Sequence, residues 1–264
     1  MAEKMNETER YYREAINDPY KCMETVKKAP WSIRYAKEQT LELCMEAVQN
    51  DGEVLAYVKE QTPEICMAAV KNDGLALDYV KEQTPEICMA AVKNYGLALE
   101  YVKEQTPDIC MAAINSNGLA LQYVKEQTPE ICMAAVNNSG WALEYVKEQK
   151  PEICMAAVQE NFRAIRFVKE QTPEVCMAAI NESAKALQYI EHQTPEMFIA
   201  AMKHDSRAVN YISEECAKSL INNVEKRISN RQAVKPEEYY AYQNLTAELE
   251  QINSEVDMNE DFEM

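Results

Sequence analysis

Apolar and polar positions recur at a fixed interval of 22 residues through most of the chain. In the unit from Thr62 to Gln83, an unbroken apolar run at residues 65–70 is followed by a polar turn at residues 72–74 and by a shorter segment of mixed character. A fixed period between about 20 and 50 residues is the signature of a repeat array. The pattern therefore predicts a chain built from stacked copies of one small unit.

Several residue types keep this interval together, which chance does not produce. Eight of the nine cysteines are in register, at Cys22, Cys44, Cys66, Cys88, Cys110, Cys132, Cys154 and Cys176. An aromatic row keeps the same step, at Tyr35, Tyr57, Tyr79, Tyr101, Tyr123, Tyr145, Phe167, Tyr189 and Tyr211. The five glycines are also in phase, at Gly52, Gly74, Gly96, Gly118 and Gly140. We count nine units between residues 19 and 216.

Each unit carries the signals of two helices. Thr62 suits an N-cap, Pro63 suits the first helical position, and Glu64 lies where the helix dipole favours an anion, which predicts a helix of about ten residues. Gly74 is expected to end that helix in the left-handed conformation. A second short helix is expected from residue 75 to about residue 83, which would make each unit a helical hairpin.

The two helices differ in the faces that they expose. The first is apolar nearly all round, so we expect it to be buried on several sides by its own partner helix and by the neighbouring units. The second is amphipathic. Its expected inward side chains are Ala76, Leu77, Tyr79 and Val80, and its expected outward side chains are Asp78, Lys81 and Glu82. Neither helix is long enough to persist alone, so nearest-neighbour interfaces should hold the array together.

The predicted fold class is therefore all-α, an α-solenoid of about nine 22-residue helix-turn-helix repeats with helical caps. Leucine-rich repeats have a similar length, but they require a strand of the form L-x-x-L-x-L, which this sequence lacks. The sequence divides into a capping helix at residues 1–18, the array at 19–216, C-terminal capping helices at 217–254 and an acidic tail at 255–264.

Composition argues against two classes, nucleic-acid-binding proteins and membrane-spanning proteins. The 264 residues carry a formal net charge of −17, and residues 237–264 contain nine acidic residues without a lysine or arginine. This excess of acidic over basic residues argues against direct binding of nucleic acid through its phosphates. The longest apolar run in the array has six residues, whereas a membrane span needs about 20. With a charged N-terminus and many ordered thiols, the sequence favours a cytoplasmic protein and no membrane partner.

The repeated rows of cysteine, methionine and tyrosine side chains do not indicate a disulfide, a metal site or a catalytic site. Equivalent residues of neighbouring helices lie about 8–10 Å apart, which is too far for a disulfide, and no zinc-type spacing of ligands is present. We expect the cysteines to be buried core residues. The neighbouring methionine row is expected to fill the core, with a partly exposed apolar groove as the alternative. The tyrosine row is expected to pack inside, with a stacking platform for bases or nucleotides as the alternative.

The repeat unit also resembles a known family of repeats. The phrase E-I-C-M-A-A-V-x-x-x-G-x-A-L-x-Y-V resembles an uncharacterised repeat family, a domain of unknown function seen in bacteria, protists, giant viruses and some phages. The resemblance extends over residues 19–212 and implies a helical array without known catalytic residues. The last units depart from the pattern. Phe162, Ala184 and Ser206 replace the turn glycine, and Phe198 replaces the cysteine.

Positions that vary between repeats are the candidates for binding. The position of Leu75 and the position three residues later share one face, and they hold both tryptophans and several basic residues of the array. This variable stripe predicts a partner-binding site at Trp31, Arg34, Leu75, Leu97, Leu119, Trp141, Glu144, Arg163, Arg166, Lys185 and Arg207. Tryptophan and arginine are enriched at the hot spots of protein interfaces. A solvated face that has drifted without constraint is the competing interpretation.

The sequence supports three hypotheses of function. The leading one is a non-enzymatic protein-binding scaffold, for which the resemblance suggests a viral or phage-type inhibitor or adaptor acting on a host defence protein. The second is an acidic nucleic-acid mimic that blocks a basic groove. The third is a protein that sequesters a nucleotide or another small molecule. No motif for a phosphate loop, a catalytic nucleophile, a metal or a cofactor is present, so we expect no enzyme activity.

Overall fold

The structure, a computed structural model, describes residues 7–248. Within that range it contains helices and turns and no strand, so the predicted all-α repeat architecture is confirmed. The chain separates into two compact units, Met1–Asn138 and Ser139–Met264, which are described one at a time. The predicted acidic tail at residues 255–264, and residues 249–254 of the predicted C-terminal cap, lie outside the described residues.

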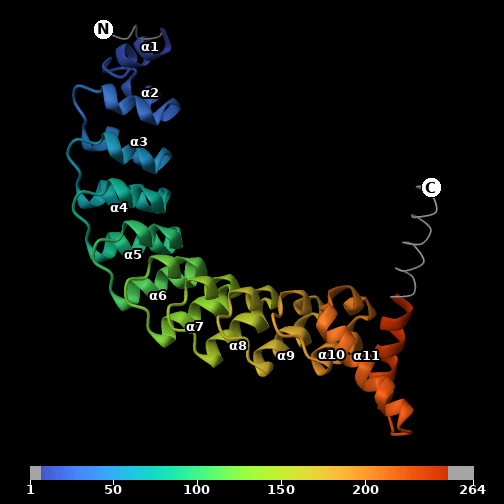
Figure 1. Cartoon of the computed structure of the whole chain (residues 1–264). Coiled ribbons are helices and arrows are strands. Elements are labelled where there is room, and N and C mark those ends of the chain that lie inside the picture. Colours follow the sequence, from blue (N-terminus) through green and yellow to red (C-terminus); the bar gives the residue numbers. More distant parts are fainter. Residues whose placement is uncertain (1–6, 249–264) are drawn as a thin grey trace, which may run out of the picture. The chain divides into compact units, whose positions relative to one another are not determined.

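Unit 1 begins with the single helix α1 (Glu7–Ala15) and continues as alternating α-helices and 3₁₀-helices (Figure 1). Its elements are α2 (Cys22–Lys28), η1 (Pro30–Tyr35), α3 (Leu41–Asn50), η2 (Gly52–Tyr57), α4 (Pro63–Asn72), η3 (Gly74–Tyr79), α5 (Pro85–Asn94), η4 (Gly96–Tyr101), α6 (Pro107–Ser116), η5 (Gly118–Tyr123) and α7 (Pro129–Asn138).

Unit 2 continues the alternation and ends in longer helices. Its elements are η6 (Gly140–Tyr145), α8 (Pro151–Glu160), η7 (Phe162–Phe167), α9 (Pro173–Glu182), η8 (Ala184–Tyr189), α10 (Pro195–His204), η9 (Ser206–Tyr211), α11 (Glu214–Ser229) and a helical segment at residues 236–248. Over the described residues, nine α-helices from α2 to α10 are each followed by one 3₁₀-helix, which matches the nine predicted units.

The α-helix of each repeat begins as its sequence predicts. In α4, the amide of Ile65 donates to Thr62 Oγ1 at 3.3 Å, and Pro63 is the first helical residue. Residues 65, 66, 69 and 70 are buried, while Met67 and Ala68 are half-buried. Within each unit, consecutive α-helices pack against one another, and an α-helix such as α4 also packs against the 3₁₀-helices of its own and the preceding repeat, η3 and η2.

The second helix differs from the prediction in type and length. It is a 3₁₀-helix that ends at Tyr79 instead of near Gln83, and Val80 already has an extended backbone with ψ 115°. The preceding repeat imposes this end, because Gln61 Nε2 donates to the carbonyl oxygen of Tyr79 at 2.9 Å and Gln61 Oε1 accepts from the amide of Lys81 at 3.0 Å. Those two backbone groups are therefore not available to continue a helix.

The predicted role of the turn glycine is wrong. No glycine in the described residues has a positive φ. The glycine is needed because the next repeat approaches closely: a Cβ atom at Gly74 would lie 2.6 Å from the carbonyl oxygen of Ala91. The amide of Gly74 also donates to Asn94 Oδ1 of that next repeat, at 2.8 Å.

Burial confirms part of the predicted core and corrects the rest. The cysteines are thiols, and all are buried except Cys22, which is half-exposed. Tyr79 was expected inside, but 39% of its surface is exposed, and the other members of the aromatic row are also half-buried or exposed. Residues 74, 76, 77 and 80 of this segment are buried, and Tyr79, the last residue of the 3₁₀-helix, lies at the edge of this buried set. Met67 is half-buried, so the methionine row is not simply core filler.

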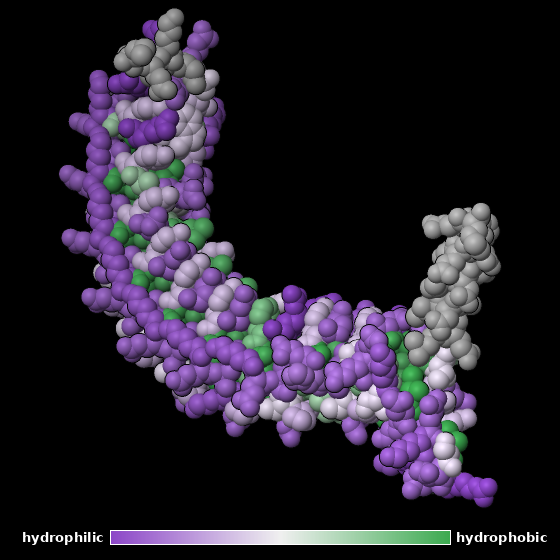
Figure 2. Space-filling view, in the orientation of Figure 1, coloured by the Kyte–Doolittle hydropathy of each residue, from purple (hydrophilic) through white to green (hydrophobic). Residues whose placement is uncertain are grey.

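Rows of side-chain hydrogen bonds join successive repeats. Asn94 Nδ2 donates to the carbonyl oxygen of Lys71 at 2.9 Å, which gives the end of α4 a partner from the next repeat. At the turns between repeats, Lys103 Nζ donates to the carbonyl oxygen of Lys81 at 3.1 Å, and Lys81 Nζ donates to that of Lys59 at 2.9 Å. Figure 2 shows the hydrophilic side chains along this edge of unit 1. These bonds fix the backbone from which the variable stripe projects.

Candidate functional site

The 3₁₀-helices carry the candidate site on their exposed side. With three residues per turn, the positions of Leu75 and Asp78 are eclipsed, and Tyr79 follows at the end of the helix. We call these three positions, repeated through η1 to η9, the outer face. It contains every residue of the variable stripe together with the aromatic row, and each of its described members is half-buried or exposed.

At the start of unit 1, the outer face is covered by α1. Trp31 is half-buried, and its ring lies edge-on to Tyr12 of α1 with 4.9 Å between the ring centroids. The guanidinium of Arg34 lies 5.2 Å from the centroid of the Trp31 ring, and its Nη2 is 3.5 Å from Glu9 Oε1 of α1. Trp31 and Arg34 therefore help to hold the N-terminal helix, a role that repeat comparison alone does not reveal.

The middle of unit 1 presents leucines beside acids. Leu75, Leu97 and Leu119 are each half-buried at the same position of successive repeats, while Asp78 and Glu100 are exposed. Two tyrosines of the outer face here rank among the exposed large hydrophobic residues, with exposed fractions of 41% for Tyr57 and 39% for Tyr79. Their exposure contradicts the expectation of inward packing.

The carboxylates of Asp78 and Glu100 help to raise the pKa values of nearby tyrosines on the outer face. Burial, and then the charges of Glu100 and Asp78, raise the pKa of Tyr101 above its ordinary value. Burial, a side-chain hydrogen bond with Glu100 and the charge of Glu100 raise the pKa of Tyr123 in the same direction. The exposed carboxylates of Asp78 and Glu100 therefore act on the neighbouring tyrosines of the outer face.

In unit 2 the outer face is aromatic and basic. Trp141 is half-buried, and its ring lies edge-on to Phe167 with 5.7 Å between centroids, while the nearby Glu144 is exposed. Arg163 lies over the ring of Phe162 at 4.8 Å, and Arg166 lies over the ring of Tyr189 at 5.4 Å.

The last two cations of the unit 2 stripe lie near one carboxylate. Arg207 forms two hydrogen bonds with Asp205, with Nη2 2.8 Å from Oδ2 and Nε 3.0 Å from Oδ1. This pairing lowers the pKa of Asp205, with a smaller contribution from the charge of Lys185. Arg163, Arg166 and Arg207 are thus held by three different partners and do not converge on one point. Asp205 and Phe162 were not among the predicted site residues.

A second exposed row lies on the α-helices. Between α3 and α4, a hollow of 530 Å³ is lined by Met45, Gln49, Glu64, Met67, Ala68, Lys71 and Asn72. The methionine row therefore borders solvent, as the groove alternative proposed.

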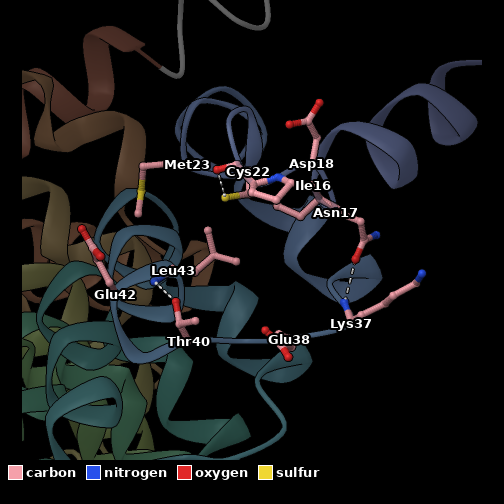
Figure 3. A pocket seen from close by; sticks show the side chains of 11 residues that line it. Ile16, Asn17, Asp18, Cys22, Met23, Lys37, Glu38, Thr40, Glu42 and Leu43 are labelled. Carbon is pink, nitrogen blue, oxygen red and sulfur yellow. Dashed lines mark hydrogen bonds between the residues drawn. The ribbon is translucent and has the colours of Figure 1, made fainter.

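The N-terminal end of unit 1 contains a hollow of 470 Å³ (Figure 3). Its lining includes the half-exposed Cys22 and the acidic residues Asp18, Glu38 and Glu42. The Cys22 thiol donates to the carbonyl oxygen of Pro19 at 3.6 Å. Within residues 7–248, no group of three or more His, Cys, Asp or Glu side chains is arranged to hold a metal ion.

Part of the repeat array matches a known family. Residues 40–84, 62–106, 84–128 and 106–149 each match the family described as a domain of unknown function, DUF4116. The four matches overlap and begin 22 residues apart, which confirms the resemblance to an uncharacterised repeat family for residues 40–149. Comparisons with curated proteins and with solved structures found no match. Among the helices of residues 7–248, none has the length and apolar character needed to cross a membrane.

Proposed function

We propose that this repeat scaffold is a non-enzymatic protein that binds a protein partner through the outer face of its 3₁₀-helices. The observation that carries the proposal is the contrast between fixed and variable positions. Gln61, Asn94 and Lys103 form bonds that link the repeats, whereas the neighbouring outer-face positions vary while remaining accessible. Variation on an exposed face of a regular array is how repeat proteins adapt to different partners.

The residue types on this face favour a protein over a small ligand. Tyrosine, tryptophan and arginine give large amphipathic contact areas and dominate interface hot spots. Arg163, Arg166 and Arg207 are each held on a separate neighbour, which argues against a shared phosphate pocket. We also propose a reducing, cytoplasmic setting for this activity, because buried thiols persist where disulfides do not form.

The more specific form of the proposal is an inhibitor or adaptor that acts on a host defence protein. It is supported only by the occurrence of similar repeats in giant viruses and phages. A nucleic-acid mimic would act through acidic surface instead, and its affinity for a basic groove would fall steeply with salt.

A position-specific cross-linking experiment tests the binding face. A photoreactive phenylalanine is placed at Leu97 on the outer face, at Glu82 on the turn edge, or at Met111 on the α-helices, and extract from the source cell is irradiated. We expect one partner protein to be joined from Leu97 and not from Glu82 or Met111. Cross-linking from Met111 alone would move the binding site to the methionine row and contradict the proposal.

A further inference from the structure

Arg34 is an example of a cation bound on the outer face. The guanidinium carbon of Arg34 lies 4.6 Å from the centroid of the Tyr35 ring and 5.9 Å from that of the Tyr57 ring. Those tyrosines belong to consecutive repeats, so the interval between successive tyrosines accepts one guanidinium. Glu9 completes the setting with a carboxylate oxygen 3.5 Å from Arg34 Nη2.

The following intervals of unit 1 keep the tyrosines but lack the arginine. The position equivalent to Arg34 is Ala56 between Tyr57 and Tyr79, and it becomes Asp78 and then Glu100 in the next two repeats. Ala56 is a small side chain beside two rings that are each about two-fifths exposed. Within the described residues, neither Asp78 nor Glu100 forms an ion pair with a lysine or arginine of the chain.

From this arrangement we infer that the outer face of unit 1, from Tyr57 to Tyr123, binds the arginine side chains of a basic protein segment. Each guanidinium lies against the tyrosine rings of consecutive repeats, as Arg34 does while its Nη2 donates to the Tyr35 hydroxyl, and two of them pair with Asp78 and Glu100. The inference rests on the proposed function and specifies the chemistry of its partner. Lysine fits less well, because its compact ammonium lacks the planar group that stacks on a ring.

The repeat spacing sets the spacing of the arginines. Neighbouring helices pack about 8–10 Å apart. An extended chain advances roughly 3.3 Å per residue, so about three residues separate successive intervals. The segment that fits therefore carries an arginine at every third residue. The net charge of −17 adds a long-range attraction for such a segment.

The experiment measures fluorescence anisotropy with a labelled peptide that contains four arginines, each separated from the next by two serines. Matched peptides carry lysine, glutamate or leucine in place of arginine. The variants are Tyr79→Leu with Tyr101→Leu, which removes two rings, and Ala56→Arg, which fills one interval with the chain's own guanidinium. Tyr20→Leu is the control, since Tyr20 is 96% exposed and lies outside the outer face.

We expect the arginine peptide to bind more tightly than the lysine peptide, and the double tyrosine variant to weaken its binding about tenfold. Ala56→Arg should weaken it severalfold, and Tyr20→Leu should leave it unchanged. Equal binding to all protein variants would overturn the inference. If only the glutamate or leucine peptide binds, and does so through Tyr79 and Tyr101, the binding face stands and the arginine inference fails. If no peptide binds, the arginine inference is overturned, while the proposed binding face is decided separately by cross-linking from Leu97.

Discussion

The side chain of Gln83 holds the carbonyl oxygen of Tyr101 at 2.8 Å, across the boundary between two repeats. Its Oε1 also accepts the amide of Lys103 at 3.0 Å and the Cys88 thiol at 3.5 Å. One amide thus ends the 3₁₀-helix of the next repeat and contacts the buried core. The equivalent glutamines repeat this bond in both units, for example from Gln61 to Tyr79 and from Gln171 to Tyr189.

Replacement of this glutamine should destabilise the array. Gln83→Leu removes hydrogen bonds to three backbone groups, the carbonyl oxygens of Leu77 and Tyr101 and the amide of Lys103. At about 1 kcal/mol per lost hydrogen bond we expect a loss of about 2–3 kcal/mol. Gln122→Leu is the matched control, because Gln122 is exposed and bonds only to Leu119 of its own helix, so its effect should stay within about 0.5 kcal/mol. Urea unfolding measures the free energy of unfolding of both variants. Equal stabilities would show that the amide bond is dispensable.

The turn glycine should be sensitive to a single added methyl group. A Cβ atom at Gly96 would lie 2.5 Å from the carbonyl oxygen of Ala113 and 2.9 Å from the Asn117 amide nitrogen. We expect Gly96→Ala to cost about 1–3 kcal/mol, the usual range for overpacking. Ala184 occupies the equivalent position in unit 2, so Ala184→Gly should cost about 1 kcal/mol or less. A neutral Gly96→Ala substitution in thermal unfolding would refute the close-approach explanation.

Thiol accessibility should single out one cysteine. Cys22 is half-exposed in the N-terminal hollow, whereas the other eight cysteines are buried. Burial also raises the pKa of thiols such as Cys66 and Cys110, which lowers the fraction of reactive thiolate. A thiol reagent at neutral pH should therefore label one equivalent rapidly, and Cys22→Ser should abolish that phase. Rapid labelling of several thiols in the native protein would be inconsistent with the buried row.

Stability should fall in alkaline solution. Burial raises the pKa of Cys176 from 9.0 to about 11, with a smaller contribution from the charge of Glu174. The folded thiol keeps its proton to higher pH than the unfolded thiol, so the unfolded chain binds fewer protons in this window. The free energy of unfolding should decrease as the pH rises from about 9 towards 11. Urea midpoints for the native chain and Cys176→Ala should show a shallower decline in the variant, and parallel declines would contradict this assignment.

The 22-residue pattern predicted the repeat number, the α-helix of each repeat and the burial of most cysteines, because those features depend on local caps and apolar runs. Thr62 and Pro63 are local signals that mark where the helix begins. The type of the second helix was not predictable in this way. It ends at Tyr79 because Gln61, 18 residues earlier, binds its carbonyl oxygen, and a contact of that range leaves no local signal.

The candidate site was only partly predictable, for the same reason. Variation between repeats identified the positions of Leu75 and Arg163, but it did not show that Trp31 and Arg34 contact α1. The sequence also did not show that Tyr79, as the last residue of its 3₁₀-helix, lies at the edge of the core with 39% of its surface exposed.

The central claim is that the outer face binds the protein partner. The most direct test is calorimetry with the partner recovered by cross-linking, using the native chain, the double variant Trp141→Ala with Arg163→Glu, and a chain truncated after residue 254. Neither side chain forms one of the inter-repeat hydrogen bonds, and because Trp141 does contact Phe167 of the next repeat, circular dichroism checks that the double variant is folded. We expect it to bind at least about tenfold more weakly, in keeping with hot-spot truncation, and the truncated chain to bind normally. Full affinity in the double variant, together with loss in the truncated chain, would contradict the claim and assign binding to the acidic C-terminal residues.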